Sequence, residues 1–151
     1  MKKLVIANSG KSHQGKTTSI KKVLEQLRAK YPCHIIRQDR HDIKATIQIG
    51  DVLIGIESQG DPISNLLQSI DDFVAMGCQI IIAACRTYGD TYNKIVELNT
   101  VHQYELIWAS HDKSPNPAYH NTLNDRYAQR VIGLIMDHIH GQLLHTEDTI
   151  H

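Results

Sequence analysis

The stretch from Leu4 to Thr18 constrains the fold more than any other part of this sequence. An apolar run, Leu4-Val5-Ile6, precedes the segment Gly10-Lys11-Ser12-His13-Gln14-Gly15-Lys16-Thr17. This segment matches the pattern G-x-x-x-x-G-K-[ST], in which a glycine-rich loop presents main-chain amides to phosphate oxygens. A helix is expected next, because apolar residues recur at helical spacing at Ile20, Val23, Leu24 and Leu27. We therefore expect a strand, a phosphate-binding loop and a helix.

Each position in this loop has an expected physical role. Gly10 and Gly15 allow positive φ angles, and the helix that follows adds a partial positive charge at its N-terminus. Lys16 is expected to reach the β- and γ-phosphates, and the Thr17 hydroxyl to ligate Mg²⁺. The expected phosphate-binding residues are Gly10, Lys11, Ser12, His13, Gln14, Gly15, Lys16, Thr17 and Thr18.

The rest of the chain alternates between strand and helix patterns. Strands are expected over residues 3–7, 33–38, 43–49, 52–56, 79–85 and 104–109, and helices over 16–30, 91–101 and 122–140. A further helix should begin at Asp61-Pro62 and stop at Gly77. Residues 43–49 alternate apolar and polar, which predicts a half-exposed edge strand joined to 52–56 as a hairpin through Gly50-Asp51.

These elements predict an α/β fold in one domain over residues 1–151, with a frayed tail over about 143–151. Strands separated by helices favour a three-layer α/β/α sandwich with a mainly parallel sheet and the hairpin at its edge. Ligands of such sheets bind beyond the carboxyl ends of the strands. The candidate windows are therefore residues 8–18, 38–42, 57–61, 85–90 and 109–120.

The loop motif and its flanking elements resemble the P-loop nucleoside-triphosphatase superfamily. The resemblance implies a bound ATP or GTP with Mg²⁺, and ATP is preferred because the sequence has no N-K-x-D guanine signature. The loop is also similar to G-K-G-G-x-G-K-T-T of the septum-positioning, partition and iron-protein ATPases. Lys11 occupies the place of the lysine that in those proteins reaches the partner's nucleotide in a dimer, although Ser12-His13 replaces their glycine pair. An ordinary solvated loop lysine is the alternative for Lys11.

The resemblance also implies an acid at the end of a buried strand, which supports Mg²⁺ or positions water. Glu57 fits that place, with a surface acid as the alternative, whereas Asp51 lies in the turn at the opposite end of the strand. Asp61 is explained as a helix N-cap, although Ser58, Gln59 or Asp61 could also contact the substrate.

Two further windows supply candidate catalytic residues. The similarity to small-molecule and nucleotide kinases suggests Asp39 for orienting or deprotonating an acceptor hydroxyl and Arg40 for contacting an acceptor anion, against a merely charged loop. Arg86 follows the most apolar strand and could stabilise charge during phosphoryl transfer, while Asp90 or Thr91 would cap the next helix. Residues 110–120 are where this superfamily commonly contacts the base.

Composition narrows the partners and the compartment. Residues 1–50 contain eleven Lys or Arg and three acids, whereas residues 51–151 contain five and thirteen, so the basic half could surround an anion. With eight aromatic residues and no basic run among them, a nucleic-acid partner is not expected. No segment has the length of a membrane span, and three cysteines without a close pair favour reduced, buried thiols in a cytoplasmic protein.

Three functions follow from these observations. The first is a kinase that transfers the γ-phosphoryl group of ATP to a small-molecule or nucleotide acceptor, with Lys16, Arg86, Asp39 and Glu57 as catalytic candidates and Thr17 and Glu57 near Mg²⁺. The second is an ATPase switch that forms a homodimer through Lys11. The third is a nucleotide-binding regulatory module.

Overall fold

The computed structural model describes residues 2–10, 15–59 and 65–150, with side chains as far as Gly141. Over these ranges the chain forms an α/β fold with six strands and four α-helices. The strands are β1 (Leu4–Ser9), β2 (Cys33–Gln38), β3 (Ile43–Ile49), β4 (Val52–Glu57), β5 (Ile80–Cys85) and β6 (Glu105–Trp108). The helices are α1 (Lys16–Arg28), α2 (Leu66–Ala75), α3 (Asp90–Thr100) and α4 (His120–Ile150).

The strands form one mixed sheet in the order β2-β3-β4-β5-β1-β6. The β4–β5, β5–β1 and β1–β6 pairings are parallel, whereas the β2–β3 and β3–β4 pairings are antiparallel. The strand and the helix expected on either side of the glycine-rich loop are confirmed as β1 and α1. The expectation of a mainly parallel sheet therefore holds for one part of the sheet only.

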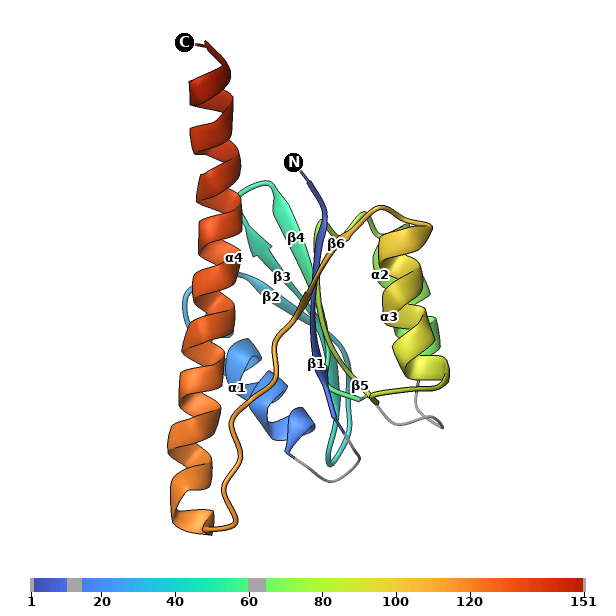
Figure 1. Ribbon diagram of the computed structural model, residues 1–151, viewed down its shortest axis with the longest axis vertical. Coiled ribbons are helices and arrows are strands. Elements are labelled where there is room, and N and C mark those ends of the chain that lie inside the picture. Colours follow the sequence, from blue (N-terminus) through green and yellow to red (C-terminus); the bar gives the residue numbers. More distant parts are fainter. Residues whose placement is uncertain (1, 11–14, 60–64, 151) are drawn as a thin grey trace.

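Helices cover both faces of the sheet, with α1 and α4 on one face and α2 and α3 on the other (Figure 1). Because side chains alternate along a strand, each strand contributes to two apolar layers. Leu4 and Ile6 of β1 pack in the layer that also contains Ile20, Val23 and Leu24 of α1 and Val131 and Ile135 of α4. Val5 and Ala7 pack in the layer that also contains Leu66, Ile70 and Phe73 of α2 and Ile95 and Leu98 of α3.

The prediction that residues 43–49 form a half-exposed edge strand is wrong. β3 lies inside the sheet between β2 and β4, and its first five residues are buried. Lys44 and Thr46 are buried, whereas Gln48 is exposed. Helix α2 covers Lys44, which pairs with Asp72 at 2.5 Å and lies over the Phe73 ring. β2 takes the edge position instead, and its residues alternate between half-buried and exposed.

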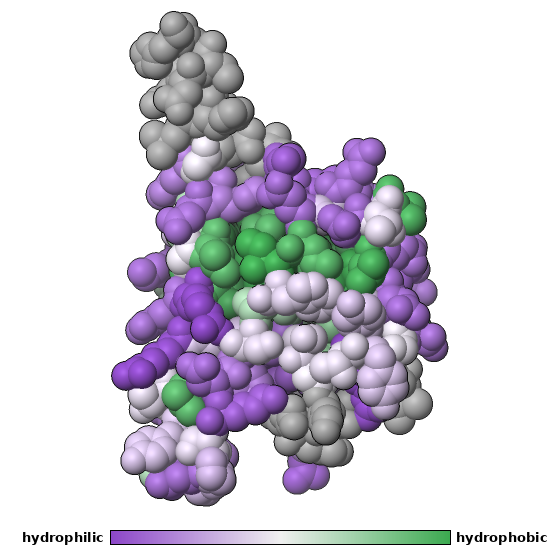
Figure 2. Space-filling model, in the orientation of Figure 1, coloured by the Kyte–Doolittle hydropathy of each residue, from purple (hydrophilic) through white to green (hydrophobic). Residues whose placement is uncertain are grey.

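β6 ends the sheet order on the other side, where it pairs with β1 (Figure 1). Figure 2 shows apolar side chains gathered on the side of the molecule that Figure 1 presents, between α4 and α3. Trp108, 40% exposed, stacks on Tyr92 with the ring centroids 5.2 Å apart. In the part of the chain that the structure describes, no helix is long and apolar enough to cross a bilayer.

The remaining elements match their expected ranges with shifted ends. α2 ends before Gly77, whose φ of 78° favours glycine, as expected. Its expected start at Asp61-Pro62 lies outside the described residues. α4 begins at His120 and continues to Ile150, beyond the expected end at residue 140.

The cysteines are free thiols, as expected, and two of them are buried. Burial raises the pKa of Cys78 to about 12 and that of Cys85 to about 11. Both are therefore neutral thiols near pH 7. Cys33 on the edge strand is half-buried instead, because β2 has a neighbour on one side only.

Candidate functional site

The candidate site lies at the end of the sheet where the carboxyl ends of β1, β4, β5 and β6 meet (Figure 1). The β2–β3 connection reaches the same end, because β2 runs parallel to β4 through two antiparallel pairings. The described residues of all five windows proposed from the sequence therefore lie at this one end of the sheet.

The phosphate-loop candidate joins β1 to α1. Gly10 leaves β1 with its amide donating to the Cys85 carbonyl at 3.1 Å, and Gly15 precedes α1 with a φ of 81°. This left-handed conformation is one that glycine adopts without steric cost. Lys11, Ser12, His13 and Gln14 lie outside the described residues.

Lys16 is the first residue of α1 and is only 5% exposed. Its Nζ donates to the carbonyl oxygen of Gly10 at 2.6 Å and to that of Cys85 at 3.0 Å. The ammonium group therefore lies back across the start of the loop, between the ends of β1 and β5. A buried lysine costs free energy unless its charge is satisfied, and here main-chain carbonyls contribute to that.

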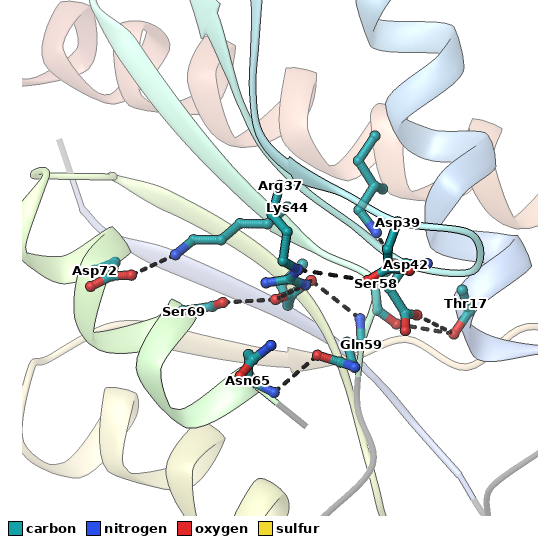
Figure 3. A network of polar contacts seen from close by, with 12 residues as sticks. Thr17, Arg37, Asp39, Asp42, Lys44, Ser58, Gln59, Asn65, Ser69 and Asp72 are labelled. Atoms are coloured by element: carbon teal, nitrogen blue, oxygen red, sulfur yellow. Dashed lines mark hydrogen bonds and ion pairs between the residues drawn. The ribbon is translucent and has the colours of Figure 1, made fainter. Parts of the chain in front are cut away.

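Thr17 faces the β2–β3 connection. Its Oγ1 lies 3.5 Å from Asp42 Oδ1 and donates to the Ser58 carbonyl at 3.1 Å (Figure 3). Hydroxyl, carboxylate and carbonyl oxygens are the ligand types that Mg²⁺ prefers. Asp42 is thus an acid beside Thr17 that the sequence interpretation missed, although it ends the charged stretch that supplied Asp39 and Arg40.

Asp39 shapes the connection that carries Asp42. Its Oδ1 accepts hydrogen bonds from the amides of Asp42 at 2.8 Å and His41 at 2.9 Å. These bonds, with the Asp42 amide contributing most, lower the pKa of the Asp39 carboxyl below its ordinary value. In this geometry Asp39 is a loop-forming carboxylate and a weak base, so its expected role of deprotonating an acceptor is not favoured.

Glu57 lies on the opposite face of the sheet from Thr17. Its side chain has no exposed surface, and its two oxygens lie 2.7 and 2.8 Å from Nη2 of Arg37. Ser69 of α2 donates to it at 2.7 Å. Alternation along β4 sends Glu57 toward α2 and Ser58 toward α1. The structure therefore gives Glu57 an ion-pairing role under α2, in place of the expected position beside Mg²⁺.

Two other residues proposed after β4 also form hydrogen bonds with neighbouring segments. The Ser58 hydroxyl accepts from the Ile43 amide at 2.8 Å and joins β4 to β3. The Gln59 side-chain oxygen accepts from the Asn65 amide at the start of α2 at 2.9 Å. Asp61 lies outside the described residues, and Asp51 lies in the β3–β4 turn at the far end of the sheet.

Arg86 follows β5 and is half-buried. Its amide donates to the Thr91 hydroxyl at 3.1 Å, which fixes the start of the β5–α3 connection. The N-cap of α3 is Gly89, without a side-chain cap, so neither Asp90 nor Thr91 has the expected capping role. Arg86 is not among the described residues that line the two cavities beside the start of α1.

Two cavities flank the start of α1 and share Gly15 and Thr18. One of about 630 Å³ extends toward the β2–β3 connection and is lined by Gly15, Lys16, Thr17, Thr18, Lys21, Arg40, His41, Asp42, Gln59 and Ala84. The other, of about 410 Å³, extends toward the β6–α4 connection and is lined by Gly15, Thr18, His111, Asp112, Lys113, Ser114, His120, Leu123 and Asn124. The N-terminus of α1 thus faces space on both sides.

The larger cavity has a basic rim. Lys21 lies one turn along α1 and donates to the His41 carbonyl at 2.8 Å, and Arg40 is exposed at the same connection. With Lys16 these side chains place three cations around a cavity in which Asp42 is the one carboxylate among the described lining residues. Such a distribution favours an anionic ligand.

Comparisons with protein-family models, with curated proteins and with solved structures find no match to this chain.

Proposed function

We propose that the chain is a nucleoside-triphosphate-binding protein of the P-loop type, with ATP and Mg²⁺ as ligands, and that it transfers the γ-phosphoryl group to a small anionic acceptor. The observation that carries the proposal is the start of α1. There a left-handed Gly15, a buried Lys16 and a helix N-terminus face two cavities. This combination favours a polyanion, because the amides of a helix N-terminus and a lysine ammonium group both attract phosphate oxygens.

The two cavities suggest how the substrate would lie. The triphosphate would follow the loop at the start of α1, where Lys16 can exchange its carbonyl partners for phosphate oxygens. The nucleoside would occupy the smaller cavity beside residues 111–114. The larger cavity would hold the acceptor, since Lys21 and Arg40 lie on its rim. An anionic acceptor oxygen can attack without a general base. This agrees with the Asp39 carboxylate being a weak base.

The oxygen donors beside α1 fit a magnesium ion. Thr17 and Asp42 would hold it, because their oxygens lie 3.5 Å apart and Mg²⁺ is commonly held by one or two carboxylates together with substrate phosphates. The bound ion would neutralise charge on the β- and γ-phosphate oxygens.

In the transfer step, the acceptor oxygen bonds to the γ-phosphorus while the bond to the β–γ bridging oxygen breaks, leaving ADP. The contribution of this chain is positioning and charge stabilisation, which dominate phosphoryl transfer. Lys16 would stabilise the charge that develops on the transferred group. Arg40 and Lys21 would hold the acceptor anion in line with it.

The direct test of the binding proposal compares two lysines of α1. Lys16→Ala should weaken MgATP binding about 10- to 100-fold, because it removes a charge-assisted hydrogen bond. Lys22→Ala is the matched control, since Lys22 pairs with Glu25 and Asp125 and lies outside both cavities. Calorimetric titration would measure both. Equal affinity in the two variants would contradict the proposal.

The reaction is tested by ADP release from ATP in the presence of a panel of phosphorylated and carboxylated metabolites. One compound should raise the rate above the basal rate, and Arg40→Ala should raise its KM more than it lowers kcat. If every acceptor fails while MgATP still binds, the kinase proposal is wrong. Nucleotide-dependent dimerisation that Lys11→Ala abolishes would then favour the ATPase-switch alternative.

A further inference from the structure

His111 lies beside Gly15, the residue before α1, although it comes from a distant part of the chain. It follows β6 by three residues, is 7% exposed, and lines the smaller cavity together with Gly15. A Cβ atom built on Gly15 would lie 3.3 Å from Nε2 of His111. The imidazole therefore covers the one residue of the described loop that has left-handed geometry.

Buried contacts hold this ring in place. Nδ2 of Asn8 lies 3.0 Å from Nδ1 of His111, and the same Nδ2 donates to the Ser19 hydroxyl at 2.9 Å. Ser19 in turn donates to the Lys16 carbonyl at 2.9 Å. The Asn8 NH₂ group is a donor to which Nδ1 of the neutral ring can act as acceptor, and Nε2 is the ring atom that faces Gly15.

The far side of the ring is packed as well. Tyr127 of α4 meets His111 edge to face, with the ring centroids 6.1 Å apart and the planes at 85°. Asn8 has no exposed surface, and its Oδ1 has no hydrogen-bond partner among the described residues.

We propose that His111 is a positioning residue for the phosphate loop and that Asn8 acts on the loop through it. The ring keeps Gly15 in its left-handed turn while it forms one wall of the cavity assigned to the nucleoside. The same side chain thus sets the geometry for the phosphates and for the nucleoside. This inference rests on the proposed nucleotide binding and adds residues that the loop motif does not contain.

A core histidine with a purely structural role would affect stability alone. The positioning role has a distinct signature, because it alters the affinity for an anion that has no nucleoside to touch the cavity wall. Magnesium tripolyphosphate is such a probe, and MgATP is its counterpart with the nucleoside attached. Binding of both is measured by calorimetry under conditions where urea titration shows each variant to be fully folded.

His111→Ala should weaken tripolyphosphate binding about 10-fold, because the loop is no longer preorganised. His120→Ala is the matched control: His120 lines the same cavity, but its ring contacts the Ser114 carbonyl. It should leave tripolyphosphate affinity unchanged. Asn8→Ser, alone and combined with His111→Ala, tests the linkage, and the two losses should not add.

The outcomes separate the two proposals. Tripolyphosphate affinity in His111→Ala equal to that of the wild type, or an equal loss in His120→Ala, would overturn the role of His111 and leave nucleotide binding standing. Additive losses in the double variant would overturn the link through Asn8. If the wild-type protein binds neither tripolyphosphate nor MgATP, the proposed function and this inference both fail. If Asn8→Ser does not fold, His111→Gln is measured in its place. Its loss of tripolyphosphate affinity is expected to be smaller than that of His111→Ala.

Discussion

Glu57 illustrates how a single residue can be placed correctly along the chain and still be misread. It ends a buried strand, as an acid near Mg²⁺ would, yet its carboxylate lies under α2 beside Arg37 and Ser69. The choice between the two roles depends on which face of the sheet the side chain takes. One residue along the chain, Ser58 faces α1 instead and its carbonyl meets Thr17.

Removing the partner of this buried carboxylate should destabilise the protein. We expect Arg37→Ala to lower the free energy of unfolding by about 3–5 kcal/mol, because an unpaired charge remains in the interior. Lys2→Ala, which breaks the exposed 2.7 Å pair with Glu105, should change it by less than about 1 kcal/mol. Urea denaturation would measure both, and similar values for the two variants would contradict the structural role of Glu57.

At the scale of elements, the close approach of β4 and α2 depends on a glycine. A Cβ atom on Gly55 would lie 2.5 Å from Cγ of Phe73, a ring with no exposed surface. The ring cannot move aside in a packed layer, so the helix would have to shift away from the sheet. That shift would also disturb Ser69 and Asp72, through which α2 contacts β4 and β3.

Gly55→Ala should therefore lower the free energy of unfolding by about 1–3 kcal/mol. Gly133 in α4 is the matched site, because nothing lies within 4 Å of a Cβ atom there. Gly133→Ala should stabilise the protein by about 0.5–1 kcal/mol, since alanine favours the helix. Thermal unfolding of the two variants should thus shift in opposite directions. A neutral Gly55→Ala would show that α2 packs more loosely than the structure indicates.

At the scale of the whole molecule, ligand binding and folding are linked. A ligand at 100 times its dissociation constant adds about 2.7 kcal/mol to stability, which for a chain of this length raises Tm by about 5–10 °C. We expect that rise with MgATP, and we expect EDTA to reduce it because Thr17 and Asp42 would hold the ion. Mg²⁺ alone is the control and should change Tm little. A rise that EDTA leaves intact would argue against the magnesium site.

The element pattern was largely readable from the sequence, because hydrophobic spacing is a local property. The recurrence at Ile20, Val23 and Leu24 predicted α1, and Gly15 before Lys16 predicted the turn that precedes it. The alternation along residues 43–49 predicted a strand correctly. It also predicted an edge position, whereas this strand lies inside the sheet. Whether Lys44 is exposed depends on α2, which lies some twenty residues further along the chain.

The sequence by itself determined that a glycine-rich loop follows an apolar strand and begins a helix, since these depend on backbone geometry and residue spacing within about 30 residues. Only the tertiary structure decided which acid lies beside Thr17, which face Glu57 occupies, and that Asn8 and His111, 103 positions apart, meet near Gly15. Such pairings arise from strand order and side-chain direction, and no local pattern in the chain records either.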